Sequence, residues 1–99
     1  MDDGYTDRVL DLVERIPPGQ VLSYGAIAEI LGEGGPRQVG RVMAMDGGSV
    51  PWWRVVRADG GLTSAHGVGA QEHYAEEGTP MRANGQAVDI ARALWTFGG

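Results

Sequence analysis

Cysteine is missing from this chain of 99 residues, and its absence excludes several kinds of chemistry. Without a thiol, the protein can form no disulfide, no thiolate metal site and no thiol nucleophile. Structural disulfides are typical of secreted proteins, whereas proteins of the reducing cytoplasm do without them. We therefore expect a cytoplasmic protein.

Long hydrophobic runs are missing as well. No stretch of eighteen apolar residues occurs, and the first fifteen residues contain five acids, Asp2, Asp3, Asp7, Asp11 and Glu14. A membrane span needs about twenty apolar residues, and a secretory signal starts with a basic segment. We therefore expect neither. A chain of 99 residues that is 42 % hydrophobic fits one domain, residues 1–99.

Lysine is also absent, so all eight basic side chains are arginines. The guanidinium group is planar and forked, which suits pairing with phosphate and stacking on bases. The net charge of −5 argues against a nucleic-acid partner, but residues 34–66 hold four arginines and only two acids. This distribution allows a positively charged centre, although on charge alone ordinary exposed arginines are the better explanation.

The spacing of apolar residues predicts three helices in the first half of the chain. The first has Thr6 as its N-cap and ends before Pro17. The second has Ser23 as its N-cap and ends at Gly32, and the third begins at Pro36. The second and third helices, joined by a glycine-rich turn, form a helix-turn-helix pattern. This pattern also occurs in domains that do not touch DNA.

The third helix has an apolar face and an arginine face. Val39 and Val42 lie on the apolar face, whereas Arg37 and Arg41 lie on the opposite one. Gly40 lies within the helix, where glycine costs roughly 1 kcal/mol relative to alanine. Such a glycine indicates the close approach of another backbone, either of DNA or of another helix.

The second half of the chain predicts short elements separated by glycines. We expect an extended segment over residues 55–57, a turn over 59–61, a helix over 71–77 and an amphipathic piece over 88–95. Ile90, Leu94 and Trp95 of the last piece are expected to pack on the core. Trp53 is also expected to be a core residue.

Three stretches, GQVLSYGAIAEILG, PRQVGRVM and VPWWRVVRADG, resemble in this order the DNA-binding domain of alkylguanine-DNA alkyltransferases. The resemblance runs from about Thr6 to Gly78. It implies a mainly α-helical fold with a small β element, a winged helix-turn-helix-like domain similar to the C-terminal domain of those enzymes. In them, a Pro-Cys-His-Arg-Val motif holds the cysteine that accepts the alkyl group. Trp52 stands at the position of that cysteine here. In this respect the chain resembles the non-enzymatic alkyltransferase-like proteins, which have tryptophan there.

The residues at the reaction centre argue against alkyl transfer. Transfer requires a nucleophile activated by a base, and an indole is not such a nucleophile. By the resemblance, Trp53 replaces the histidine of the activating relay, and Glu77 corresponds to its glutamate. Glu77 is then left with nothing to activate. We therefore expect no enzyme, no catalytic residue, no metal and no cofactor.

The resemblance also assigns roles in DNA binding. It places Tyr24 beside the phosphate that rotates when a base leaves the duplex, and Arg37 in the gap that the base leaves. The third helix enters the minor groove, where Gly40 lets the sugar-phosphate chain approach. Arg41 is a candidate phosphate contact. The residues that we assign to the lesion pocket are Trp52, Val55, Ala65 and His66.

The implied function is recognition without reaction. A monomer binds double-stranded DNA containing O6-alkylguanine, flips the lesion into the pocket and marks it for nucleotide excision repair proteins. Two other classes stay open. One is a sequence-specific helix-turn-helix transcriptional regulator that reads the major groove. The other is a hydrolase that uses His66 or His73 with Glu72, although these residues match no common zinc pattern.

Overall fold

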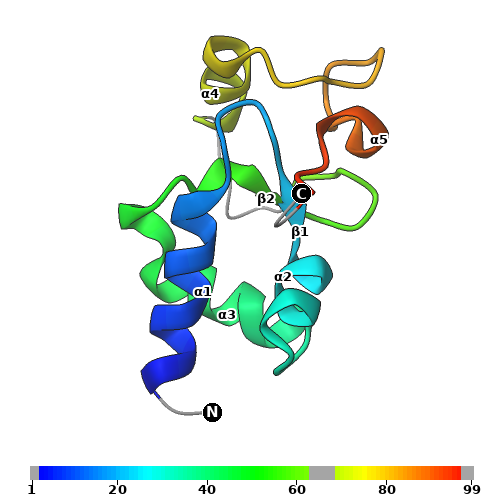
Figure 1. Cartoon of the computed structure of the whole chain (residues 1–99). Helices are drawn as coiled ribbons and strands as arrows, with labels where there is room; N and C mark the ends of the chain where they lie inside the picture. The colour runs from blue at the N-terminus through cyan, green and yellow to red at the C-terminus, as the bar shows by residue number, and fades with distance from the viewer. Residues whose placement is uncertain (1–2, 63–68, 97–99) are drawn as a thin grey trace.

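The computed structural model describes residues 3–62 and 69–96 of the chain, and these are mainly helical with a small β element (Figure 1). In chain order the elements are α1 (Asp3–Arg15), β1 (Leu22–Ser23), α2 (Tyr24–Leu31), α3 (Pro36–Asp46), the 3₁₀ turns η1 (Gly47–Ser49) and η2 (Trp52–Arg54), β2 (Val55–Val56), α4 (Ala70–Glu77) and α5 (Ile90–Ala93). This confirms the expected fold class. Within the two described ranges, no helix is long and apolar enough to cross a membrane.

Helices α1, α2 and α3 gather at one end of the molecule around a hydrophobic cluster, with α4 and α5 at the other end (Figure 1). The buried residues of α1 recur every three or four positions and therefore share one face. The helical members of this first cluster are Tyr5, Val9, Leu12, Val13, Ile27, Ala28, Val39 and Val42, and Ile16 directly follows α1.

Helix α1 begins earlier than the sequence predicted. Thr6 is not its N-cap, because the helix already starts at Asp3. Tyr5, which precedes the predicted start, is only 2 % exposed and donates a hydrogen bond from its hydroxyl to the carbonyl oxygen of Glu33 at 3.2 Å. The burial of this ring keeps the additional turn helical.

The predicted helix-turn-helix is confirmed, and local signals set its boundaries. The Ser23 hydroxyl accepts a hydrogen bond from the Ala26 amide at 3.0 Å, which caps α2. Gly32 ends α2 in the left-handed conformation, with φ at 70°. Pro36 occupies the first turn of α3, and the Gln38 side chain accepts from the Gly35 amide at 3.0 Å.

The two strands divide the interior into two layers. Strands β1 and β2 are parallel, with Leu22 opposite Val55, and α2 and α3 lie in the crossover that such a pair requires. Because side chains alternate along extended backbone, Leu22 and Val55 face the first cluster, whereas Val21 and Val56 face the second. The other buried members of the second cluster are Ala70, Tyr74, Val88 and Ala93.

The C-terminal segment forms less helix than the sequence predicted. Only residues 90–93 are helical, and the next residues are extended beside Val21. Leu94 is 47 % exposed, so its expected place in the core is wrong. Ala93 and Trp95 flank it and pack inward, which turns the intervening side chain outward. Ile90 and Trp95 are partly buried against the clusters, as expected.

The turn predicted over residues 59–61 is present, and it can be made only with glycine. Gly60 has a φ of +84°, and a Cβ atom there would lie 2.0 Å from the carbonyl oxygen of Val88. The Val88 amide donates back to the Gly60 carbonyl at 2.9 Å. The turn after β2 is thereby attached to the segment that leads into α5.

The carboxylate of Glu77, at the end of α4, connects three parts of the chain. Its Oε1 accepts from the Gly19 amide at 3.0 Å and from Arg54 Nε at 3.1 Å. Its Oε2 accepts from Arg54 Nη2 at 2.5 Å and from Trp53 Nε1 at 2.9 Å. Arg54 also donates from Nη1 to the carbonyl oxygen of Ile16 at 2.9 Å. The tryptophan-bearing turn η2 is therefore fixed to α4 and to the end of α1.

Burial alone would raise the pKa of Glu77, but the hydrogen bonds from Arg54, the Gly19 amide and Trp53 outweigh it and lower the pKa below its ordinary value. A carboxyl whose pKa is lower in the folded than in the unfolded chain stabilises the fold above its unfolded pKa. That stabilisation is lost as the pH falls through the lowered folded pKa.

Replacement of Glu77 by glutamine keeps the shape of the side chain but leaves the guanidinium of Arg54 without its counter-charge. We expect Glu77→Gln to lower the free energy of unfolding by about 2–4 kcal/mol at pH 7. As the pH falls below the ordinary glutamate value of 4.5, the parent and the variant should begin to converge, and their difference should vanish only below the lowered folded pKa. Urea denaturation at several pH values measures both effects.

The matched control is Glu76→Gln, at the exposed neighbouring position of α4. It removes the same charge from the same helix and should change stability by less than about 0.5 kcal/mol. Equal losses for the two variants at pH 7 would contradict the role given to Glu77.

Candidate nucleic-acid interface

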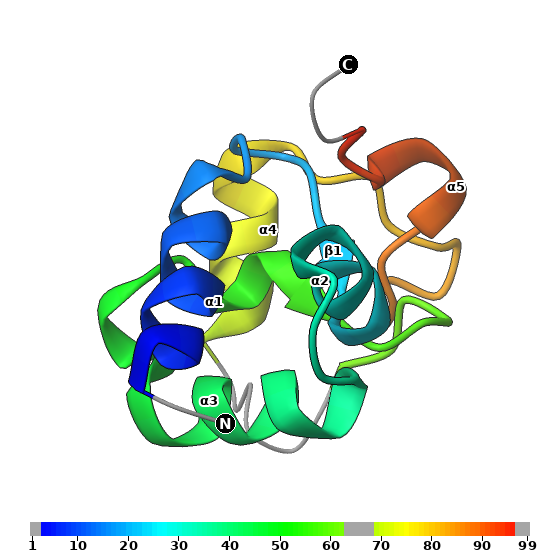
Figure 2. The same cartoon turned by 60° about the horizontal axis from the view of Figure 1, so that its bottom comes forward.

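Helix α3 presents an exposed face with two arginines. Figure 2 shows the helix along the lower edge of the molecule. Val39 and Val42 are buried beneath it, whereas Arg37 and Arg41, one turn apart, are exposed. Within the described ranges, neither arginine makes a side-chain hydrogen bond or an ion pair. Both guanidinium groups are therefore available to an anionic partner.

Gly40 lies on the same side of α3 as these arginines. A Cβ atom added to it would meet no atom within 4 Å outside the backbone of its own helix. The sequence left open whether DNA or another helix approaches this glycine. No neighbouring helix among residues 3–62 and 69–96 requires it.

Tyr24 begins α2, directly after the capping Ser23. Its ring is half-buried and packs against the first cluster. Its hydroxyl makes no hydrogen bond within the part of the chain that the structure describes. Because β1 pairs with β2, the start of α2 and the end of the tryptophan motif are fixed relative to each other.

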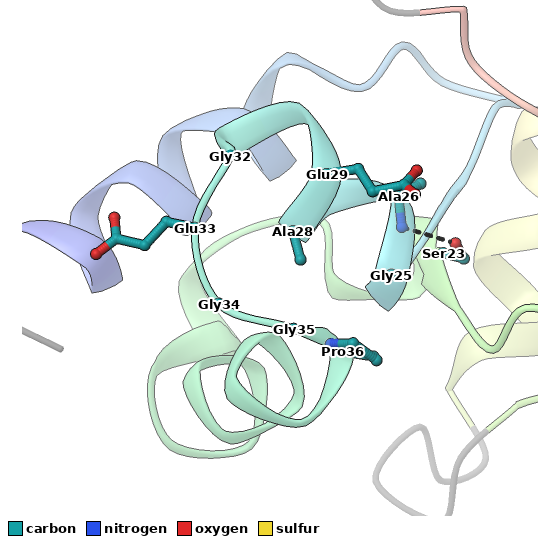
Figure 3. A pocket seen from close by; sticks show the side chains of 10 residues that line it. All are labelled: Ser23, Gly25, Ala26, Ala28, Glu29, Gly32, Glu33, Gly34, Gly35 and Pro36. Atoms are coloured by element: carbon teal, nitrogen blue, oxygen red, sulfur yellow. Dashed lines mark hydrogen bonds between the residues drawn. The ribbon is translucent and has the colours of Figure 1, made fainter.

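A pocket of about 600 Å³ lies between the first turn of α2 and the turn that leads into α3 (Figure 3). Small residues make up most of its lining, and the Ser23 hydroxyl bonds the Ala26 amide at one edge. The lining residues are Ser23, Gly25, Ala26, Ala28, Glu29, Gly32, Glu33, Gly34, Gly35 and Pro36. Neither Trp52 nor Val55 lines this pocket, so it is distinct from the lesion pocket predicted from the sequence.

Three aromatic rings meet where η2 contacts α4. Trp53 and His73 are stacked, with ring centroids 3.5 Å apart and planes inclined by 3°. Trp52 is nearly perpendicular to both, at 5.5 Å and 87° from Trp53 and at 5.8 Å and 85° from His73. The outer edge of the Trp52 indole also lies beside Gly69, where an added Cβ atom would be 3.8 Å away.

The other residues assigned to the lesion pocket are placed differently. The side chain of Val55 is fully buried in the first cluster, so only its backbone can line a pocket near Trp52. Ala65 and His66 lie outside the described residues. In the described part of the chain, no group of three or more histidine, aspartate or glutamate side chains could hold a metal ion.

Trp53 and Glu77, which the resemblance aligned with an activating relay, are hydrogen-bonded to each other. The single ring nitrogen of Trp53 donates its hydrogen to Glu77, so this side chain has no basic lone pair. Trp53 is half-buried and packs on the second cluster, which agrees with the expected core position. The sequence did not reveal that Glu77 also accepts from Arg54 and Gly19.

The contact of His73 with Trp53 was also missed. The sequence considered this histidine only as a hydrolytic or metal-binding group, with Glu72. His73 and Glu77 are four residues apart and thus share one face of α4, which is the signal that the sequence contained. That spacing does not indicate which residue packs against the face.

The family model of the 6-O-methylguanine DNA methyltransferase DNA-binding domain matches residues 4–79. The "DNA base-flipping protein" of Escherichia coli (strain K12) is 33 % identical over 101 residues, covering 97 % of this chain and 78 % of that protein. A protein of the same name from Vibrio parahaemolyticus is 31 % identical over 64 residues, covering 62 % of this chain and 64 % of its own length.

Solved structures agree with these sequence relatives. The crystal structure of S. pombe Atl1 in complex with damaged DNA containing O6-carboxymethylguanine has a TM-score of 0.82, at 29 % identity, covering 97 % of this chain and 98 % of that one. A further crystal structure, of S. pombe ATL in complex with DNA, has a TM-score of 0.76 with the same identity and coverage.

The matched residues include the helix-turn-helix, the tryptophan motif and Glu77, and the chain contains no cysteine. The chain therefore belongs to the family of the 6-O-methylguanine DNA methyltransferase DNA-binding domain and is, within it, an alkyltransferase-like protein.

Proposed function

We propose that this protein binds double-stranded DNA containing O6-alkylguanine, flips the lesion into a pocket walled by Trp52, and transfers no alkyl group. The observation that carries the proposal is a chain without any cysteine that has an indole, Trp52, where the resemblance expects the acceptor cysteine. It is supported by relatives named for base flipping and by the similarity to Atl1 bound to damaged DNA.

Base flipping requires that the protein compensate for the lost pairing and stacking. Extrusion costs a few kcal/mol and costs least for a damaged base. Stacking of a base on an aromatic side chain contributes about 1–3 kcal/mol. Trp52 is half-buried, so part of its indole is accessible for such a contact. The contact and the weaker pairing of the lesion together favour binding of the damaged base.

The exposed face of α3 is suited to the duplex itself. Arg37, in the first turn, fills the gap left by the base, and Arg41 contacts phosphate. Gly40 has no protein neighbour on that side, which allows the sugar-phosphate backbone to come close. The Tyr24 hydroxyl is available to the rotated phosphate.

The absence of alkyl transfer follows from the groups at the former reaction centre. An alkyl acceptor needs an activated lone pair, and Trp52 does not supply one. Trp53 cannot act as a base toward it, because an indole nitrogen is a donor only, and here it donates its N–H to Glu77. The complex therefore stays reversible and keeps the lesion intact.

A reversible complex is useful only if another protein removes the lesion. We propose that the bound monomer marks the site for nucleotide excision repair proteins, in the cytoplasm. The marked feature is the distorted duplex together with the exposed protein surface that faces away from α3.

The test of the proposed function is a titration of labelled duplexes with and without one O6-methylguanine. Tighter binding to the modified duplex is expected, with a change in tryptophan fluorescence as Trp52 meets the base. Mass spectrometry of the protein afterwards should show no added methyl group. Equal affinity for the two duplexes, or a methylated protein, would show that the proposal is wrong.

Arg37→Ala should weaken binding to the modified duplex by about 1–3 kcal/mol, because the gap in the stack is no longer filled. Arg92→Ala removes the same charge from an exposed position on α5 and is the matched control. It should weaken binding far less. If the two variants lose equal affinity, net charge rather than gap filling accounts for the effect.

Gly40→Ala should separate stability from DNA binding. Alanine is the better helix former and meets no protein atom at this position, so the variant should unfold up to about 1 kcal/mol less readily than the parent. Its methyl group should nevertheless weaken binding to both duplexes by blocking the close approach. Thermal denaturation and the duplex titration check this pair of effects, and undiminished DNA affinity would refute the role of Gly40.

A further inference from the structure

Helix α4 holds Trp53 at three separate points. The ring of His73 covers one face of the indole, with centroids 3.5 Å apart. The carboxylate of Glu77 accepts from the indole nitrogen at 2.9 Å. The hydroxyl of Tyr74 donates to the backbone carbonyl oxygen of Trp53 at 2.6 Å. These contacts fix the face, the edge and the backbone of a single residue.

The contacts restrict different motions of Trp53. The hydrogen bond to Glu77 sets the rotation of the ring about its side-chain bonds, and the bond from Tyr74 sets the position of the main chain. Neither prevents the plane of the ring from tilting. The flat contact with His73 does, because two parallel rings at this separation lose contact when either tilts. The guanidinium of Arg54 also contacts this ring, at 5.4 Å from the Trp53 ring centroid.

Trp52 lies beside this stacked pair, whose two rings turn their edges toward it. Its plane is inclined by 87° to Trp53 and by 85° to His73, at centroid distances of 5.5 and 5.8 Å. Edge-to-face contacts are favourable because the positive edge of one ring meets the negative face of another. Trp52 makes this contact with two rings that share one orientation, so the tilt of the pair determines the plane of Trp52.

We propose that His73 is a positioning residue of the lesion site, which sets the plane of Trp52 through its stack on Trp53 and through its own perpendicular contact with Trp52. The inference rests on the proposed function, because it identifies what orients the aromatic wall that an extruded alkylated guanine meets. His73 itself touches neither DNA nor base in this scheme. It acts through the two tryptophan rings that it contacts.

The property that matters is the flat ring. An aliphatic side chain at position 73 would cover the Trp53 ring but has no flat surface to fix the tilt of that ring. A phenyl ring keeps the stack and removes the imidazole nitrogens. His73→Phe and His73→Leu therefore separate ring planarity from general burial and from polarity.

Two properties are measured on the parent, His73→Phe and His73→Leu: the circular dichroism of the free protein and the affinity for DNA. Near-ultraviolet circular dichroism of the free protein reports the mutual orientation of Trp52 and Trp53, independently of any DNA. We expect the bands of the parent to persist in the phenylalanine variant and to weaken in the leucine variant. Urea denaturation establishes that all three are folded under the conditions of the measurement.

Duplex titration then measures the effect on the site. An aromatic pair contributes enough to change affinity about two- to tenfold. His73→Leu should weaken binding to the O6-methylguanine duplex by that factor and change binding to the unmodified duplex less than twofold. His73→Phe should bind both duplexes with the affinity of the parent. Gln71→Leu, exposed on the opposite side of α4, is the control for an added leucine on this helix.

Unchanged dichroism and affinity in the leucine variant would overturn the inference, and so would an equal loss in the phenylalanine variant. A parent protein that does not discriminate the lesion would contradict the proposed function instead. In that case the dichroism still decides whether His73 orients the two tryptophans. The two failures are thus distinguishable.

Discussion

The position of the tryptophan motif depends on one carboxylate. Glu77 accepts hydrogen bonds from the motif itself, through Trp53 and Arg54, and from the Gly19 amide in the segment that follows α1. The side chains of Arg54 and Glu77 are only 13 % and 11 % exposed, so their attraction is weakly screened by water. A short turn such as η2 has few hydrogen bonds of its own. It is held in place by this external network.

The same network is structural in this chain, whatever the corresponding residues do in related enzymes. By the resemblance, Glu77 occupies the place of a glutamate that activates a nucleophile through a histidine. Here the indole of Trp53, in place of a histidine, donates the hydrogen bond to this glutamate, and Arg54 supplies the compensating charge. The connection between α4 and the motif is retained, but no proton can be passed along it.

Local signals explain which elements could be predicted from the sequence. Helices α2 and α3 were predicted because Ser23, Gly32 and Pro36 determine their ends through their own backbone preferences. The start of α1 was missed because the burial of Tyr5, a tertiary effect, extends that helix. Leu94 was misplaced because a strand-like contact with Val21 overrides the helical period.

The candidate site was predictable to the extent that it follows a short motif. Arg37 and Arg41 lie on the exposed face that the helical spacing predicted. The stack of His73 on Trp53 joins segments that are distant in the sequence, and no local pattern indicates it.

The distribution of ion pairs has a consequence for how the molecule meets DNA. Arg8 is neutralised by Glu33 and Arg54 by Glu77, whereas Arg37 and Arg41 have no acidic partner in the part of the chain that the structure describes. On a protein of net charge −5, this concentrates attraction for a polyanion on α3 and leaves repulsion elsewhere. We therefore expect encounters with a polyanion to depend on orientation, favourable where α3 faces it and short-lived elsewhere.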